Sequence, residues 1–224
     1  RWDQLLNMWR EHQVREVLVA GRFRRGEMVA RLLAPGSALR GFFEQLPDRR
    51  DQTVLGALAR HLAAQGIRVL DQLKYIPDHL PEPGVLAGPP PSPAEEHDVE
   101  IGLRVARLLA AQDVGQTIVL KQGVILAAEA ADGTDATIRR GGEMAPGAVV
   151  VKVSRPRQDP RFDVPTIGPE TIEVMRAVGA RALAIEARRT IVLERQRLAA
   201  IADAAGISVL AVDAPPLQQV ETPT

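Results

Sequence analysis

The chain has 224 residues, 46% of them hydrophobic and 25% charged, which is the composition of an ordinary folded protein. Its 28 Lys and Arg residues balance its 28 Asp and Glu residues, and only 3% of the chain is aromatic. These values exclude the basic surface and the base-stacking platform of a nucleic-acid-binding protein. The absence of cysteine excludes disulfides, thiolate nucleophiles and cysteine-bound metals, so a bound metal would take oxygen ligands, as magnesium or manganese does.

The pattern of apolar runs predicts an α/β protein with two small domains joined by a proline-rich linker. The N-terminal domain is expected over residues 1–76. Its first predicted element is a helix with no strand before it, so we expect a Rossmann-like domain that lacks its first strand. The predicted helices cover residues 2–13 and 53–65, and the predicted strands cover residues 14–20 and 67–70.

Prolines separate the two domains. Between Pro77 and Pro93 the chain has seven prolines, which remove backbone donors and restrict φ, so neither a helix nor a central strand can run through this stretch. We interpret residues 77–97 as a semi-rigid linker or a long crossing loop. Residues 214–224 are polar, contain three prolines and are expected to form a flexible tail.

The C-terminal domain, residues 98–213, has the longer α/β alternation and is expected to be the catalytic domain. The Gln122-Gly123 pair between two apolar runs predicts a β-hairpin. Pro169 and Gly179 mark the first turn and the end of one helix. The predicted helices cover residues 98–111, 134–140, 169–178 and 195–205, and the predicted strands cover residues 117–120, 124–129, 148–153, 182–187, 190–193 and 207–212.

One familiar motif fails. Gly21 and Gly26 have the spacing of a phosphate-binding P-loop, but Glu27 and Met28 stand where Lys and Ser or Thr are required. An acidic residue there would repel phosphate, so we interpret the segment as an ordinary strand-to-helix loop. No nucleophile-elbow or dinucleotide-binding glycine motif occurs either, which argues against a serine hydrolase and a dinucleotide oxidoreductase.

Two groups of polar residues stand at element boundaries in the C-terminal domain. Asp113 to Gln116 lies where a helix gives way to a strand, and Glu129 to Asp135 follows a strand and opens a helix. Both have a structural explanation, since Asp and Gly form turns and Thr134 and Asp135 suit a helix start. The alternative is a ligand site, because open α/β sheets bind ligands beyond the carboxyl ends of their strands.

A cationic segment, residues 152–168, connects a strand to the next helix. Its acidic residues, Asp159 and Asp163, are outnumbered by four basic ones: Lys152, Arg155, Arg157 and Arg161. The segment is either a solvated surface loop or, together with the free amides at the start of the helix at Pro169, a site for an anionic ligand. Combined with the acidic groups, it fits phosphoryl chemistry, in which cationic groups stabilise charge and a metal acidifies the attacking water.

Several motifs in this domain have a recognisable order and spacing. They are Asp113-Val-Gly-Gln116, Asp132-Gly-Thr-Asp135 with Arg139-Arg140, Lys152-Val, Gln158-Asp159, Arg161-Phe-Asp-Val-Pro-Thr-Ile-Gly168 and Glu186-Ala187. In these motifs the chain resembles the UDP-2,3-diacylglucosamine pyrophosphatase family of lipid A biosynthesis in Gram-negative bacteria. This is the magnesium-dependent, two-domain type, unrelated to the calcineurin-like enzymes. The resemblance is weaker in the N-terminal domain, where Val17 to Gly21 carries part of it.

The resemblance implies hydrolysis of the pyrophosphate of UDP-2,3-diacylglucosamine to UMP and 2,3-diacylglucosamine 1-phosphate. It carries over Asp163 as the catalytic residue, which would bind magnesium, or manganese in its place, or orient the water. We infer the other roles from residue type. Asp135 is the expected second metal ligand, with Asp132 and Asp159 as alternatives, and Lys152 is expected to be catalytic. Substrate binding is expected from Gln116, Thr134, Arg155, Arg161 and Thr166.

The chain departs from the family pattern at two of these places. Asp132 stands where the family usually has Glu, and Gly26 stands where a proline usually follows the matching arginine.

The implied partners follow from the substrate. Each acyl methylene withdrawn from water stabilises a lipid in the membrane by about 0.8 kcal/mol, so we expect transient contact with the inner-membrane surface. No apolar run approaches the length of about 20 residues that spans a bilayer, and the first residues are not a secretory signal, so the expected location is the cytoplasm, with peripheral contact at the inner membrane. A homodimer is suggested by family precedent. The alternative function is a non-catalytic sugar-nucleotide or lipid-binding module with the same fold.

Overall fold

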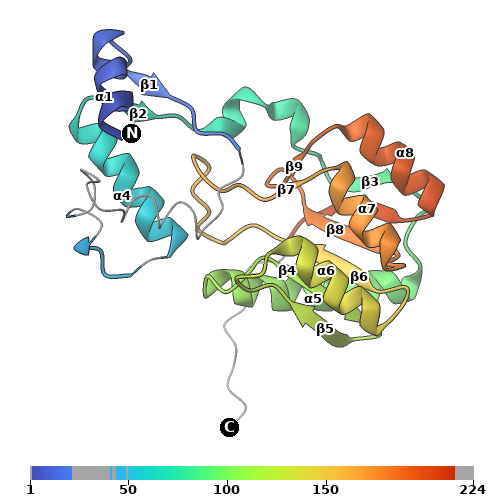
Figure 1. Ribbon diagram of the computed structural model, residues 1–224. Helices are drawn as coiled ribbons and strands as arrows, with labels where there is room; N and C mark the ends of the chain where they lie inside the picture. The colour runs from blue at the N-terminus through green and yellow to red at the C-terminus, as the bar shows by residue number, and fades with distance from the viewer. Residues whose placement is uncertain (1, 22–40, 42–43, 49, 215–224) are drawn as a thin grey trace. The chain divides into compact units, whose positions relative to one another are not determined.

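A computed structural model describes residues 2–21, 41, 44–48 and 50–214 (Figure 1). The chain forms two compact units. The first comprises residues 1–75 together with residues 159–163, and the second comprises residues 76–158 and 164–224. Both units combine helices with parallel strands, which confirms the predicted α/β class. The predicted P-loop-like segment at Gly21 to Met28 and the predicted tail lie, except for their first residues, outside the described part of the chain.

The first unit is a small layer of helices on a two-stranded parallel sheet. Strand β1 pairs in parallel with β2. The α4 helix ends where Gly66 adopts a positive φ of 77°, a conformation that favours glycine. Its elements are α1 (Trp2–Glu11), β1 (Glu16–Val17), α4 (Asp51–Ala64), β2 (Arg68–Val69) and the 3-10 helix η1 (Gln72–Tyr75).

A short excursion from the second half of the sequence belongs to this first unit. Phe162 is buried in the same apolar cluster as Leu6, Leu55 and Leu62. The sequence assigned residues 159–163 to the C-terminal domain because they are contiguous with it. The structure instead places them in the first unit, since burying the Phe162 ring removes apolar surface from water.

The second unit is built on a mixed sheet whose described strands run in the order β3-β10-β8-β6-β4-β5. Strands β6, β8 and β10 are parallel, and β4 and β3 run against them. The predicted hairpin between β4 and β5 is confirmed. The elements are β3 (Gly84–Ala87), α5 (Pro93–Ala111), β4 (Thr117–Lys121), β5 (Val124–Ala128), α6 (Thr134–Met144), β6 (Val149–Lys152), α7 (Pro169–Ala177), β8 (Ala182–Glu186), α8 (Arg195–Ala205) and β10 (Ser208–Val212).

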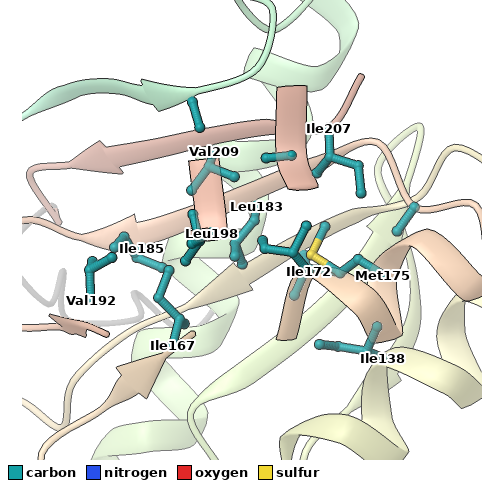
Figure 2. Close-up of a cluster of buried hydrophobic side chains, with 14 of the residues drawn as sticks. Ile138, Ile167, Ile172, Met175, Leu183, Ile185, Val192, Leu198, Ile207 and Val209 are labelled. Carbon is teal, nitrogen blue, oxygen red and sulfur yellow. The ribbon is translucent and has the colours of Figure 1, made fainter. Parts of the chain in front are cut away.

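Each face of this sheet is covered by helix, as parallel strands require. Helices α6, α7 and α8 pack on one face, where Ile138, Ile172, Met175 and Leu198 meet alternate strand residues (Figures 1 and 2). Helix α5 packs on the other face through side chains that include Leu103. The strands are therefore apolar at successive positions, which is why continuous apolar runs in the sequence predicted them well.

The proline-rich segment differs from its predicted form. It contains the 3-10 helix η2 (Pro77–His79) and the edge strand β3, which pairs with β10. Helix α5 begins at Pro93 rather than at residue 98, because Ser92 and Glu95 form a reciprocal capping box and proline is tolerated in the first turn. Strands β7 (Thr166–Ile167) and β9 (Ile191–Val192) form a separate parallel pair.

Within the described residues, no helix is long and apolar enough to cross a membrane.

Candidate active site

The polar residues of the second unit gather at one edge of its sheet. Strands β5, β6, β8 and β10 run in the same direction, so their carboxyl ends meet at this edge, and the antiparallel β4 begins there. This carboxyl edge is where open α/β sheets bind ligands. The predicted residues Gln116, Thr134, Lys152 and Arg155 all stand on the segments that enter or leave it.

Glu129, which directly follows β5, links two segments of the carboxyl edge. Its Oε2 accepts a hydrogen bond from the Gln116 backbone amide at 3.1 Å, and its Oε1 accepts one from the Thr134 hydroxyl at 3.0 Å. Burial raises the pKa of Glu129, but the charge of Lys152 and hydrogen bonds from Thr117, Gln116 and Thr134 outweigh that effect and lower the pKa below its ordinary value. Glu129 is thus an ionised anchor.

Lys152 ends β6 and is only 6% exposed. Lysine is rarely this buried without a partner. Its Nζ donates to the Thr134 hydroxyl at 2.7 Å, and Glu129 lies on the other side of that hydroxyl. Strand β6 therefore places the buried Lys152 ammonium at the carboxyl edge, where the Thr134 hydroxyl lies between it and the Glu129 carboxylate.

Gln116 connects the start of β4 to the segment that follows β6 by a hydrogen bond. Its side-chain amide donates to Gln158 at 3.2 Å. The neighbouring Gly115 is packed so closely that an added Cβ would lie 2.1 Å from the Glu129 carbonyl oxygen. No side chain fits there, which explains the glycine in the Asp113 to Gln116 motif.

Arg155, three residues beyond Lys152, is held by a different kind of partner. It is 3% exposed, and its Nε donates to the Asp113 carboxylate at 2.6 Å. Asp113 adopts a left-handed backbone with φ 58°, the turn conformation that its sequence motif suggested. This direct ion pair fixes a guanidinium at the carboxyl edge.

Glu186 forms the buried centre of the carboxyl edge. It ends β8, and its carboxylate accepts from the Ser154 amide at 2.8 Å, the Ser154 hydroxyl at 2.6 Å and Arg107 of α5 at 3.1 Å. Since a buried carboxylate must be compensated, these donors hold the chain just before Arg155. The cationic segment is thereby fixed at Ser154 by the hydrogen bonds of Glu186, which Arg107 also contacts.

The two aspartates of the turn after β5, Asp132 and Asp135, have different surroundings. Asp132 is exposed and pairs with Arg140 of α6, whose hydrogen bonds hold the pKa of Asp132 below its ordinary value. Asp135 lies in the first turn of α6, where the helix dipole favours a negative charge. Asp132 is thus held by an arginine of the helix that follows it.

The remaining predicted residues belong to other segments. Asp163, half-buried and with a left-handed backbone at φ 46°, belongs to the first unit, as does Arg161. The Arg161 guanidinium grips Asp159, with Nη2 2.7 Å from Oδ2, and these bonds lower the pKa of Asp159 against the raising effect of burial. Thr166 lies in β7 of the second unit and donates to the Val164 carbonyl at 3.0 Å.

The donor set can be compared with what magnesium requires. Among the described residues, no three His, Asp or Glu side chains gather into a potential metal site. Two alternative ligands, Asp132 and Asp159, are already bound by Arg140 and Arg161. Magnesium commonly takes only one or two carboxylates and completes its shell with water and substrate phosphates. A magnesium ion here would therefore have to be carried with a phosphate ligand, because the described residues form no all-protein cage.

The sequence did not single out some residues of this edge. In the sequence Glu129 is one of three acidic residues in its turn, and Arg107 and Ser154 belong to no motif of the site. Their signal was weak because each is remote in sequence from its partner, such as Arg107 from Glu186. A polar residue within two positions of the end of a strand, as Ser154 and Glu129 are, was the one pattern that could have identified them.

A mixed sheet with a parallel centre, crossover helices and buried cations at its carboxyl edge is typical of α/β proteins that bind anionic ligands. The family models agree with this class. The model of the LpxI C-terminal domain matches residues 82–210, and that of the LpxI N-terminal domain matches residues 1–79. The chain belongs to the LpxI family, which confirms the resemblance inferred from its motifs.

A curated relative is the UDP-2,3-diacylglucosamine pyrophosphatase LpxI of Caulobacter vibrioides, which is 38% identical over 133 residues. The match covers 54% of this chain, and the chain spans 48% of the length of that protein.

Proposed function

We propose that this protein hydrolyses the pyrophosphate bond of UDP-2,3-diacylglucosamine, releasing UMP and 2,3-diacylglucosamine 1-phosphate. Membership of the LpxI family and the name of the Caulobacter relative support this substrate. The observation that carries the proposal is the pair of buried cations, Lys152 and Arg155, at the carboxyl edge of the family-matched second unit. Two fixed positive charges suit a diphosphate better than a neutral ligand.

The reaction needs little covalent chemistry from the protein. A water oxygen forms a bond to one phosphorus while the bridging P–O bond breaks, and the electron pair of that bond stays on the leaving phosphate. The water gives up a proton, which passes to the solvent. Negative charge therefore builds up on the phosphate oxygens, and cations that are already in place stabilise it without reorganising. In this proposal Lys152 and Arg155 supply that charge, and Gln116 contributes a neutral amide.

Asp163 is the proposed catalytic carboxylate, as the family motif implies. Magnesium, or manganese in its place, is the proposed cofactor, held by Asp163 and Asp135 together with phosphate oxygens of the substrate. When bound, the ion supplies positive charge to the diphosphate and makes the attacking water more acidic. Arg161 and Thr166 are proposed as further substrate contacts, and Thr134 as an indirect one, because its hydroxyl already binds Glu129 and Lys152.

The two acyl chains of the proposed substrate suggest where the protein works. We propose a cytoplasmic protein that contacts the inner-membrane surface transiently, because the lipid is anchored there. A homodimer is proposed on family precedent alone.

The decisive experiment follows UMP release from UDP-2,3-diacylglucosamine by the purified protein in the presence of magnesium. Asp163→Asn should lower the rate by about 100-fold or more, because it removes a charge and a ligand while keeping the shape of the side chain. Glu100→Gln is the matched control, since Glu100 is an exposed carboxylate on α5. It should leave the rate unchanged.

Each result has a distinct meaning. Release that persists in Asp163→Asn would remove Asp163 from the mechanism. Rates that do not change when magnesium is chelated would remove the metal. Tight binding of the substrate by the wild type without any release would favour the non-catalytic binding module.

A further inference from the structure

Glu129 has no role in the proposed reaction, yet it is tied to two segments of the carboxyl edge. Its two carboxylate oxygens bind different partners, the backbone of Gln116 at the start of β4 and the hydroxyl of Thr134 at the start of α6. The second bond leads onward to Lys152.

The direction of this chain of hydrogen bonds follows from the chemistry of its ends. The Lys152 ammonium can only donate, so at 2.7 Å the Thr134 hydroxyl accepts from it. An ionised carboxylate can only accept, so the single proton of the hydroxyl points to Glu129 at 3.0 Å. The lowered pKa of Glu129 is consistent with the ionised form. The shorter bond to the charged carboxylate is favoured over the 3.5 Å contact between the Thr134 and Thr117 hydroxyls, so the order is Lys152 to Thr134 to Glu129.

The neighbouring cation shows what the hydroxyl achieves. Arg155 bonds directly to the carboxylate of Asp113. Lys152 is almost as buried but has a neutral atom between itself and Glu129. The Thr134 hydroxyl thus links the ammonium to Glu129 and fixes the direction of one of its N–H bonds.

We propose that Glu129 is a positioning residue that acts through Thr134 to hold the Lys152 ammonium at the carboxyl edge in the orientation that receives the diphosphate. This inference rests on the proposed function. Glu129 itself touches no substrate in this arrangement. Its effect on the reaction should therefore disappear when Lys152 is absent.

The test uses a hydroxyl that can be kept or removed with little change of shape. Thr134→Ser retains the hydroxyl, and Thr134→Val replaces it with a methyl group. Glu129→Gln keeps the length of the side chain but removes its charge. We expect kcat/KM for UMP release to stay within about threefold of wild type in Thr134→Ser and to fall at least about tenfold in Thr134→Val and Glu129→Gln.

The double variants with Lys152→Met separate positioning from general stability. If Glu129 acts through Lys152, adding Glu129→Gln or Thr134→Val to Lys152→Met should lower kcat/KM by less than about twofold further. A full further tenfold loss in the double variants would overturn the proposal, because Glu129 would then act independently of Lys152.

A second readout needs no turnover. Acetic anhydride labels lysine amines, and mass spectrometry compares Lys152 with Lys121, which donates to the Gly147 carbonyl at the opposite end of the sheet. Removing the hydroxyl in Thr134→Val, or the carboxylate charge in Glu129→Gln, destabilises the charged ammonium and should raise the labelling of Lys152 about threefold or more. Thr134→Ser should not raise it, and Lys121 should stay unchanged.

Unchanged Lys152 labelling in both variants would overturn the inference, whatever the activity. Selectively raised labelling in a protein whose wild type releases no UMP would overturn the proposed function while supporting the link from Glu129 to Lys152.

Discussion

The two edges of the second unit's sheet satisfy their buried polar side chains with different kinds of hydrogen-bond partner. At the amino edge, buried or half-buried polar side chains bind the backbone. Asp98 accepts from the amides of Gln122 and Gly123 at 2.8 and 2.7 Å, and Lys121 donates to the Gly147 carbonyl at 2.7 Å. These bonds close turns and need nothing further.

At the carboxyl edge, polar side chains bind one another across elements that are distant in sequence. Lys152 binds Thr134, Arg155 binds Asp113 and Arg107 binds Glu186. Side chain–side chain bonds make up only about 10–15% of hydrogen bonds in folded proteins. Several such bonds occur together at the carboxyl edge, where they fix charged side chains in place. At the amino edge, the side-chain bonds instead stabilise backbone turns.

The largest expected difference between the edges concerns their lysines. Lys152→Met should lower kcat/KM for UMP release by about 100-fold, because it removes a fixed charge from the site. Lys121→Met loses one hydrogen bond to a carbonyl, which costs about 1 kcal/mol of stability, and should leave kcat/KM unchanged. Steady-state kinetics and thermal melts on the two variants measure both effects. Equal losses of activity would erase the distinction between the edges.

A second comparison uses two tightly packed glycines. A Cβ on Gly115 would lie 2.1 Å from the Glu129 carbonyl oxygen, and one on Gly88, near the amino edge, would lie 1.9 Å from the Ile207 carbonyl oxygen. Both Gly→Ala changes should destabilise the protein by about 1–3 kcal/mol. Gly115→Ala should also reduce kcat/KM about tenfold, because the backbone that carries Glu129 must shift. If Gly88→Ala reduced the activity of the folded protein as strongly, the amino edge would have to be included in the site.

The amino edge should matter chiefly for stability. Asp98 is buried and holds two amides, so Asp98→Ala should lower the free energy of unfolding by about 2–4 kcal/mol. Asp203 holds only the Gly88 amide and is exposed, so Asp203→Ala should cost about 0.5–1 kcal/mol. Both variants should retain normal kcat/KM per folded molecule. Urea unfolding ranks the two, and a reversed order would contradict the assignment.

The smallest expected effect is on the stability of the protein at low pH. Glu129 has a pKa below its ordinary value of 4.5, so it binds protons less readily in the folded state than in the unfolded state. Its contribution to stability is then fully present above the ordinary value and is lost as the pH falls through the lower, folded value. Urea unfolding from about pH 7 down to about pH 3 should show a shallower acid loss in Glu129→Gln than in wild type. Superimposable profiles would show that Glu129 is not an ionised anchor.

Much of the fold followed from local patterns. Apolar runs located the central strands, and the Gln122-Gly123 turn predicted the hairpin of β4 and β5. The start of α5 was placed five residues late, because the prolines around Pro93 obscured a capping box. The short β3 was missed for a related reason, since an edge strand tolerates nearby proline and a central strand does not.

The candidate site was predictable in part. Gln116, Thr134, Lys152 and Arg155 could be found because each lies at the end of a strand or on a segment that joins a strand to the next element. Whether Asp163 and Asp135 hold a metal stays a prediction. The ion partners of Asp132, Asp159 and Glu186 depend on side-chain placement and had no signature in the sequence.

The sequence by itself determined the α/β class, the positions of the main strands and the family of the protein, because apolar periodicity and motif spacing are properties of neighbouring residues. Only the tertiary structure decided that residues 159–163 pack with the first unit, that Lys152 reaches Glu129 through a hydroxyl, and that Glu186 is neutralised by Arg107. Those outcomes depend on which distant segments share a buried space, where an uncompensated charge is too costly to remain.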